Sequence, residues 1–401
     1  MCSVQVWLRA GSADERPGET GSAHMLEHMM FRGSNTVPDG EFDARMESLG
    51  AIVNASTWVD STSYTTLCAP EVLNEVLALE ADRHRGIALK SKILVAERDV
   101  VANERRQVVD ASAEAKLRER FVFAAQRGTP YAWPVIGWAE DIEAYTSGTL
   151  RAFFERCYAP SRTHVVFCGP IDAEEAERLA TEHFAAPRPE NGWRPADLFK
   201  SRPPHEADLP EEQENPERFV EFPVDVSTPI VLVGFEAPAR LDADWPAWRV
   251  ATSVLCGGES ARLPQQLEFE RAVVLSIDLE MYDTRMPLVA TLEASTRRGS
   301  SADDVLGALD DVLWELAENG PTEHELARWQ RALRTDEARA LANPESRAEW
   351  MGESWVLSGD PVRLFSTAEE LQSVTAEDVR RVARSMLAPS KRTVVIGVPL
   401  R

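Results

Sequence analysis

Cysteine is scarce in this chain and forms no recognisable framework. The 401 residues contain five cysteines, and no two of them form a CxxC pair or a disulfide-type spacing. They stand at Cys2, Cys68, Cys157, Cys168 and Cys256. A chain of this length buries enough surface to fold without covalent cross-links. We therefore expect buried free thiols.

Long apolar runs and excess positive charge are also missing. No run approaches the 18 apolar residues of a membrane-spanning helix, so we expect no membrane span. The 66 acidic residues outnumber the 43 basic ones, for a formal charge of −23. A field of that sign disfavours nonspecific binding to nucleic acid, and we expect none. General pressure for solubility explains the charge more simply than an acidic functional surface does.

The N-terminus lacks the basic, apolar and small-residue pattern of a signal peptide. It runs directly into Ser3–Leu8, whose alternation is typical of a strand. We expect a cytoplasmic protein. A periplasmic one is the alternative, because a chain whose signal had been removed would look the same.

Prolines and acidic residues gather near the middle of the chain. Seven of the 25 prolines lie within 187–217, and the end of that stretch carries six acidic residues and no basic one. Proline stiffens such a segment and self-repulsion extends it. We therefore predict an N-terminal domain over 1–186, a linker over 187–217 and a C-terminal domain over 218–401.

The two halves resemble each other. Residues 159–167 and 388–396 align without a gap at an offset of 229, and each copy has an Ala-Pro stop between a helical segment and a β-branched strand. We infer a duplicated domain. Strands and long helices are grouped within each half, which favours α+β domains with helices on one face of an antiparallel or mixed sheet. The long helices are predicted over 71–89, 92–110, 305–318 and 322–342.

Histidine is rare, and two of the seven fall in one short motif. The segment His24–His28 reads His-Met-Leu-Glu-His. On a helix, positions i and i+4 share a face, so both imidazoles can reach one ion. Glu27 can contact a water molecule on that ion without being a ligand. This is the HxxEH pattern of inverted zinc peptidases, although five residues can also match by chance.

A catalytic zinc site needs a third protein ligand and an open position. The ion acidifies a water molecule, and a carboxylate such as Glu27 must take its proton and pass it to the leaving amine. The third ligand should be a distant carboxylate. The helix predicted over 92–110 offers Glu97, Asp99, Glu104 and Asp110. Glu97 and Glu104 lie two turns apart on one face. A solvated helix face with ion pairs is the alternative interpretation.

Several motifs in order resemble the pitrilysin/insulinase family of zinc metallopeptidases, nearer to its short processing-peptidase branch than to the long insulinase branch. The resemblance covers essentially the whole chain. The matching segments are Gly11–Glu15, Gly21–Gly33, Asn54–Thr57 with Asp60 and Tyr64, and Glu104, which follows His28 at the family's spacing. It implies two homologous α+β domains that close like a clam with a partner chain.

The resemblance also implies roles for single residues. His24, His28 and Glu104 would ligate Zn²⁺, and Glu27 would be the general base. Glu97 matches the family's carboxylate that orients a ligand and tunes the site. The implied activity is endopeptidase cleavage of short unfolded peptides.

Substrate-binding residues are implied as well. Asn54, Ala55 and Ser56 match the edge strand that holds an extended peptide through main-chain bonds. Phe31 would line the cleft near the metal, and ordinary core packing is the alternative for that ring.

The second half departs from the family pattern. Its equivalent helix, near Trp245–Leu255, contains no histidine, so we expect no second zinc site. In the family a glycine-rich turn is followed by an arginine and, seven residues later, a tyrosine that grip the substrate carbonyl. The turn matches Cys256–Leu263, but the two positions hold Glu268 and Leu275. Glutamate would repel a developing oxyanion, and leucine has no hydroxyl.

Both residues are lost although the zinc motif is intact. This suggests that zinc binding and binding of the substrate carbonyl are divided between two chains. We expect the zinc-bearing subunit of a heterodimer, whose homologous partner lacks HxxEH and supplies the Arg–Tyr pair. A homodimer or monomer that uses donors such as Tyr282 or Arg285 is the alternative. A noncatalytic scaffold-type or peptide-binding subunit is a rival of another class, and the intact HxxEH motif argues against it.

Overall fold

The computed structural model describes residues 1–185 and 218–400, which form two compact units. Among the described residues, the first unit contains 1–106, 128–185 and 339–364, and the second contains 107–127, 218–338 and 365–400. Each half of the sequence therefore contributes one segment to the unit built mainly from the other half. The linker predicted over 187–217 lies outside the described residues.

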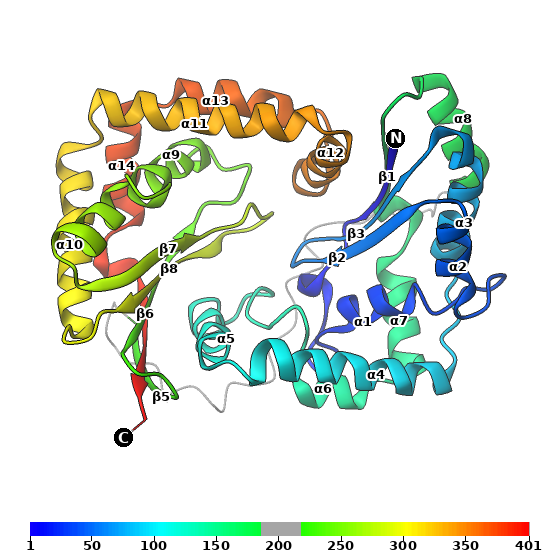
Figure 1. Cartoon of the computed structure of the whole chain (residues 1–401), viewed down its shortest axis with the longest axis horizontal. Helices are drawn as coiled ribbons and strands as arrows, with labels where there is room; N and C mark the ends of the chain where they lie inside the picture. Colours follow the sequence, from blue (N-terminus) through cyan, green and yellow to red (C-terminus); the bar gives the residue numbers. More distant parts are fainter. Residues whose placement is uncertain (186–217, 401) are drawn as a thin grey trace. The chain divides into compact units, whose positions relative to one another are not determined.

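The first unit is built on a four-stranded antiparallel sheet with the order β2-β3-β1-β4 (Figure 1). Its strands are β1 (Cys2–Leu8), β2 (Ile52–Thr57), β3 (Thr62–Cys68) and β4 (Thr163–Cys168). The strand expected over Ser3–Leu8 is confirmed as β1, an inner strand that pairs with β3 and β4. In this sheet β2 is an edge strand, with a partner on one side only.

Helices cover one face of this sheet. The even-numbered side chains of β1, among them Val4 and Val6, are buried there with residues of the helices. Figure 1 shows α2, α3 and α8 on this side. The helices of the first unit apart from α12 are α1 (Ser22–Met29), α2 (Glu41–Ser48), α3 (Leu73–Arg85), α4 (Ser91–Arg105), α6 (Ala139–Ala144), α7 (Ser147–Cys157) and α8 (Ala173–Phe184).

The opposite face of the first sheet is covered by α12 (Pro344–Ser358), which comes from far along the chain (Figure 1). Trp7 packs there with Ala348 and Val356. Gln5 is buried too, and its Nε2 donates to the carbonyl of Glu345 at 3.0 Å. The prediction of helices on one face is therefore incomplete, because the polar positions of β1 also lie under a helix.

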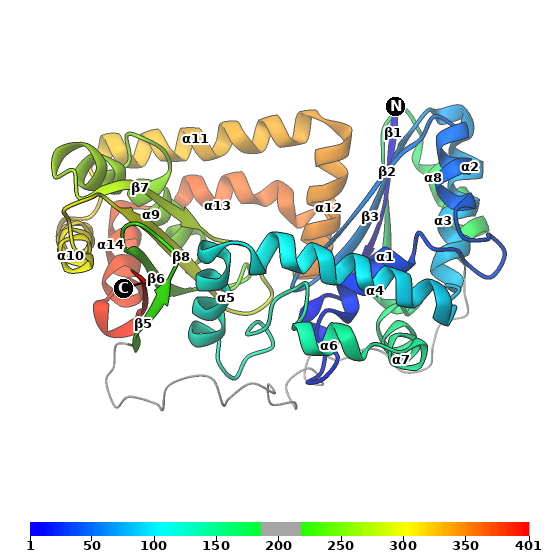
Figure 2. The same ribbon diagram turned by 60° about the horizontal axis from the view of Figure 1, so that its bottom comes forward.

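The second unit has a five-stranded mixed sheet with the order β5-β9-β6-β8-β7, in which only the β5–β9 pair is parallel. Its strands are β5 (Arg218–Val224), β6 (Ile230–Ala237), β7 (Val274–Glu280), β8 (Leu288–Thr296) and β9 (Thr393–Pro399). The helices are α5 (Ala113–Ala125), α9 (Trp245–Cys256), α10 (Ala302–Asn319), α11 (Glu323–Ala342), α13 (Thr367–Ser373) and α14 (Ala376–Met386). Figure 2 shows α5 on one side of this sheet and α10 and α14 on the other.

The two halves contain matching helices, in agreement with the sequence repeat. Helices α7 and α14 are both 11 residues long and begin 229 residues apart. Helices α5 and α12 hold corresponding places in the two halves, and each packs in the unit of the other half. On α5, Leu117 and Phe121 are buried against Leu232 and Val395. The α+β class is confirmed, and the exchange of helices was not predicted from the sequence.

Two expectations from composition are also settled. All five cysteines are free, four of them buried and Cys256 partly exposed, as expected. In the described part of the chain, no helix combines the length and apolar character needed to cross a bilayer.

His84 is a buried titratable group at the end of α3. Its side chain is 7% exposed, neither ring nitrogen has a hydrogen-bond partner, and the ring packs on Tyr64 at 5.0 Å. Glu80 lies 4.0 Å away, but its carboxylate is held by Arg83. Burial, followed by the charge of Arg83, holds the pKa of His84 well below its usual range.

The low pKa of His84 predicts a loss of stability in acid. Below the unfolded pKa of about 6.5, the unfolded chain binds a proton that the folded chain does not, so the free energy of unfolding falls with pH. Between about pH 7.5 and pH 5.5, the wild type should lose about 1.4 kcal/mol more than His84→Phe does. Urea unfolding at both pH values measures this. Equal losses in the two proteins would contradict it.

Candidate metal centre

Helix α1 has one apolar face and one polar face. Ala23, Met25, Leu26 and Met29 are buried in the core, whereas His24, Glu27 and His28 remain partly exposed. This division follows from the 3.6-residue period of a helix, which brings positions 24, 27 and 28 to one side. The core therefore anchors α1 by one face and leaves the three polar side chains available for chemistry.

The start of α1 is fixed by a buried carboxylate. Glu15 accepts hydrogen bonds from the backbone N–H groups of Gly21 at 2.8 Å and Ala23 at 2.9 Å. These are donors that a helix N-terminus leaves without an internal partner. Burial raises the pKa of Glu15 well above its usual value, and the two backbone bonds oppose that rise. Gly21 has φ of +82°, a conformation that glycine adopts most readily. The loop that contains Glu15 therefore sets the register of the histidines.

Helix α4 supplies the two carboxylates that face α1. Glu97 and Glu104 lie two turns apart, as predicted. The Glu97 side chain is 6% exposed and meets His28, whereas that of Glu104 is 38% exposed and lies beside both histidines. Leu94 and Val101 on the same helix are buried and anchor it in the core.

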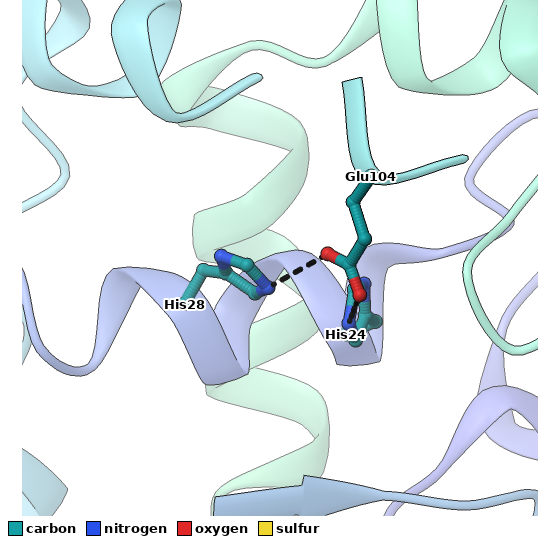
Figure 3. Close-up of side chains that lie close together, drawn as sticks. All are labelled: His24, His28 and Glu104. Carbon is teal, nitrogen blue, oxygen red and sulfur yellow. Dashed lines mark ion pairs between the residues drawn. The ribbon is translucent and has the colours of Figure 1, made fainter. Parts of the chain in front are cut away.

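Figure 3 shows the Glu104 carboxylate pointing toward the rings of both histidines. Its oxygens lie 3.7 Å from Nε2 of His24 and 3.5 Å from Nε2 of His28. The three ligand atoms lie within 4.8 Å of one another, and the described residues contain no other such group of three potential ligands. Atoms about 2.1 Å from a tetrahedral zinc ion stand about 3.4 Å apart, and the two distances from Glu104 are close to that spacing.

The two histidines differ in the hydrogen-bond partner of Nδ1. Nδ1 of His28 lies 3.0 Å from Oε1 of Glu97. An ionised carboxylate only accepts, so Nδ1 carries the proton. Nδ1 of His24 is buried without a hydrogen-bond partner. Both Nε2 atoms are thus available to an ion, and His28 is the one oriented by a protein carboxylate.

The two histidines also differ in the direction in which their pKa is shifted. Burial, and then the neighbouring His28, lower the pKa of His24 to about 4, so this ring is neutral near pH 7. Burial also lowers the pKa of His28, but the hydrogen bond to Glu97 and the charges of Glu104, Glu97 and Glu27 outweigh it. The pKa of His28 is therefore raised. A metal ion would have to displace that proton in acid solution.

Glu27 lies beside the triad and is held by the edge strand. The hydroxyl of Thr57, at the end of β2, donates to Oε2 of Glu27 at 2.6 Å. Burial raises the pKa of Glu27, and the bond from Thr57 opposes that shift only in part. A raised pKa suits a general base that works near neutral pH. The Thr57 bond engages Oε2, and Oε1 is the other proton-accepting oxygen.

Family models match both halves of the chain. Residues 1–137 match the model described as insulinase, peptidase family M16, and residues 144–333 match the peptidase M16 inactive domain. The chain belongs to the insulinase family. A Mycobacterium bovis protein named as an uncharacterised zinc protease is 29% identical over 402 residues, covering 98% of this chain and 88% of that protein.

Relatives from Helicobacter pylori extend this comparison. The zinc protease PqqE is 25% identical over 404 residues, covering 100% of this insulinase-family chain and 88% of that protein. The crystal structure of a protease from the same species has a TM-score of 0.87 and 25% identity, with 99% of this chain and 94% of that chain covered. Family membership, the fold and the peptidase class of the relatives are therefore shown.

The edge strand β2 of this insulinase-family chain exposes Asn54 and Ser56, and Ala55 lies partly buried between them. The side chain of Asn54 accepts a hydrogen bond from the N–H of Ala55 at 2.9 Å. For the N–H of Ala55 to donate a hydrogen bond to a bound peptide, the side chain of Asn54 must first release it.

Phe31 is half-buried and packs among other rings. Its ring lies 5.8 Å from that of Phe42 and 6.4 Å from that of Tyr64, and the Arg83 guanidinium lies 4.8 Å from its centroid. These contacts account for Phe31 as a packing residue. The role at the cleft implied by the family resemblance stays a prediction.

The residues at the Arg and Tyr positions of the second half have local roles. Oε1 of Glu268, on the π-helical turn η7 (Pro264–Glu270), accepts from the N–H of Ile277 at 2.9 Å. Leu275 is the extra residue of a bulge in β7, between Val274 and Ser276, and is 60% exposed. Helix α9 contains no histidine, as expected.

Three residues at the site were not singled out from the sequence. They are Glu15, Arg32, which donates to Oε2 of Glu97 at 2.6 Å, and Thr57. Thr57 stands in the segment that the resemblance identified, yet its contact with Glu27 depends on how β2 meets α1. Arg32 lies beyond the last residue of α1, so no helical spacing from His28 pointed to it.

The Thr57 hydroxyl predicts a defined loss on substitution. Thr57→Val keeps the shape and removes a hydrogen bond to a charged group, which contributes about 1.5–3 kcal/mol. We expect kcat for peptide hydrolysis to fall about tenfold or more, with KM within a factor of two, because the bond holds the base and not the peptide. Thr57→Ser, which keeps the hydroxyl, is the control. A change in KM alone would contradict this.

Proposed function

We propose that this chain is a zinc-dependent endopeptidase that cleaves short unfolded peptides. The observation that carries the proposal is the convergence of His24, His28 and Glu104 with Glu27 beside them. Two imidazoles and one carboxylate are the ligand set of catalytic zinc sites, which keep one position open. The names of the relatives, zinc proteases, support the same conclusion.

A zinc ion held by His24, His28 and Glu104 would supply Lewis-acid polarisation of the scissile carbonyl and would lower the pKa of a water molecule. Glu27 takes the proton of that water at Oε1 and delivers it to the leaving nitrogen. Thr57 keeps Oε2 in place meanwhile. The edge of β2 binds the peptide as an added strand, which requires an extended segment and excludes folded domains.

We further propose that the chain works with a homologous partner that lacks HxxEH. Glu268 is engaged with the backbone of β7, and Leu275 points an apolar side chain to solvent, so neither can donate a hydrogen bond to a substrate carbonyl. A partner that contributes an arginine and a tyrosine would supply the missing donors.

Peptide hydrolysis with and without a partner tests this proposal. A fluorogenic peptide mixture is offered to the zinc-loaded chain alone, to the chain mixed with a homologous HxxEH-lacking chain from the same source, and to both with Glu27→Gln. We expect activity in the mixture that disappears with Glu27→Gln. Full activity of the single chain would contradict the proposal that a partner chain is needed. No activity in any mixture would contradict the proposal that the chain is an endopeptidase.

A noncatalytic peptide-binding subunit is the second candidate, and one finding favours it. Residues 144–333 match the family's inactive domain. This candidate predicts that peptides bind with an affinity independent of zinc and are never cleaved. Binding of a labelled peptide to the zinc-loaded and chelator-treated chain distinguishes the two.

A further inference from the structure

A row of polar contacts runs from the surface into the metal centre. Asp39 lies 4.0 Å from Nη1 of Arg32, whose Nε donates to Oε2 of Glu97 at 2.6 Å. Oε1 of Glu97 meets Nδ1 of His28 at 3.0 Å, and Nε2 of His28 faces Glu104 at 3.5 Å. The two oxygens of Glu97 thus have different partners, one inside the centre and one outside it.

Glu97 needs both of these contacts to hold one orientation. The terminal torsion of a glutamate is broad, so a single hydrogen bond leaves the carboxylate free to turn about it. The Glu97 side chain is 6% exposed, which leaves little water to replace a lost partner. Arg32, at 41% exposed, extends across to it from beyond the end of α1. A charge-assisted bond of this kind is directional and strong.

We propose that Arg32 is a positioning residue of the metal centre, which acts through Glu97 to aim Nε2 of His28 at the ion. With Oε2 held by Arg32, Oε1 faces His28 and fixes both the ring's plane and the nitrogen that carries its proton. Contacts of this kind beyond the ligands typically change metal affinity about 10- to 100-fold. The inference rests on the proposed zinc function and adds a residue to it.

The zinc dissociation constant is the direct test, measured by competition with a chromophoric chelator on the metal-free full-length chain. We expect Arg32→Met to raise it about tenfold and Glu97→Gln at least as much. The double variant should match Glu97→Gln within a factor of two, because residues that act through one contact are not additive. Arg32→Lys, which keeps the charge but not the guanidinium, should fall between wild type and Arg32→Met.

Arg45→Met is the matched control. Arg45 pairs with Glu41 on α2, and both side chains are about half exposed, so its loss should leave the zinc dissociation constant unchanged. Circular dichroism of each variant checks folding, and Arg32→Lys keeps the test valid if Arg32→Met does not fold.

The possible results distinguish a failure of the role of Arg32 from a failure of the proposed zinc peptidase function. An unchanged zinc dissociation constant in Arg32→Met and Arg32→Lys overturns the role of Arg32 alone. So does full additivity with Glu97→Gln. A raised KM for peptides with unchanged zinc affinity would make Arg32 a substrate contact instead, which also overturns the inference. A wild-type chain that binds no zinc overturns the proposed function and this role together.

Discussion

Glu27→Gln is expected to lower kcat for peptide hydrolysis by about 10³-fold while the chain keeps its zinc. The amide can still accept the hydrogen bond from Thr57 and fills the same space, but it cannot take a proton from water. General-base catalysis of this kind contributes about 10²–10⁴-fold. KM should stay within a factor of two, because Glu27 moves a proton and does not hold the peptide.

Steady-state kinetics of the chain mixed with its homologous partner, on one fluorogenic peptide and with zinc content determined on the same samples, measures this effect. Thr57→Ser, which leaves the carboxylate in place, is the companion variant and should keep most of the activity. A Glu27→Gln protein with near wild-type kcat would show that another group takes the proton. Loss of zinc from that variant would show that Glu27 is a ligand and not the base.

Glu104→Ala is expected to weaken zinc binding by about 10²–10³-fold. Structural zinc sites bind with about 10–16 kcal/mol spread over four ligands, so one ligand accounts for about 3 kcal/mol. The Glu104 side chain is 38% exposed and lies beside both histidines, so its removal should disturb the ligand set more than the fold. Chelator competition measures the dissociation constant, and thermal unfolding with and without zinc checks the fold.

Asp99→Ala is the control for that substitution. Asp99 is an exposed carboxylate on the same helix α4 and was one of the alternatives for the third ligand that the sequence left open. Its removal should leave zinc affinity unchanged. Equal losses in both variants would mean that charge in this region, and not a specific ligand, attracts the ion.

Much of this centre could be anticipated because it depends on spacing within single helices. The period of a helix places His24 beside His28 and Glu97 two turns from Glu104, whatever the rest of the chain does. The hydrogen bond from Thr57 to Glu27 is different, since it joins a strand to a helix across 30 residues. Arg32 lies beyond the last residue of α1, so helical geometry does not determine where its side chain goes.

The exchange of α5 and α12 could not be derived from the sequence. An amphipathic pattern shows that a helix buries one face but not which sheet it covers. Trp7 and Gln5 alternate with apolar residues along β1, a pattern typical of a sheet with one solvated face. Under α12 both are buried, and Gln5 accepts from Nε1 of Trp7 at 2.9 Å. The polarity of β1 therefore predicted a solvated face wrongly, because a helix from a distant part of the sequence covers that face of the sheet.

An anomalous difference map at the zinc absorption edge, from crystals of the wild-type chain grown with zinc, shows directly which residues bind the ion. We expect one strong peak about 2.0–2.2 Å from Nε2 of His24, Nε2 of His28 and an oxygen of Glu104. A map with no peak at these three residues, or with zinc bound at other residues, would contradict it.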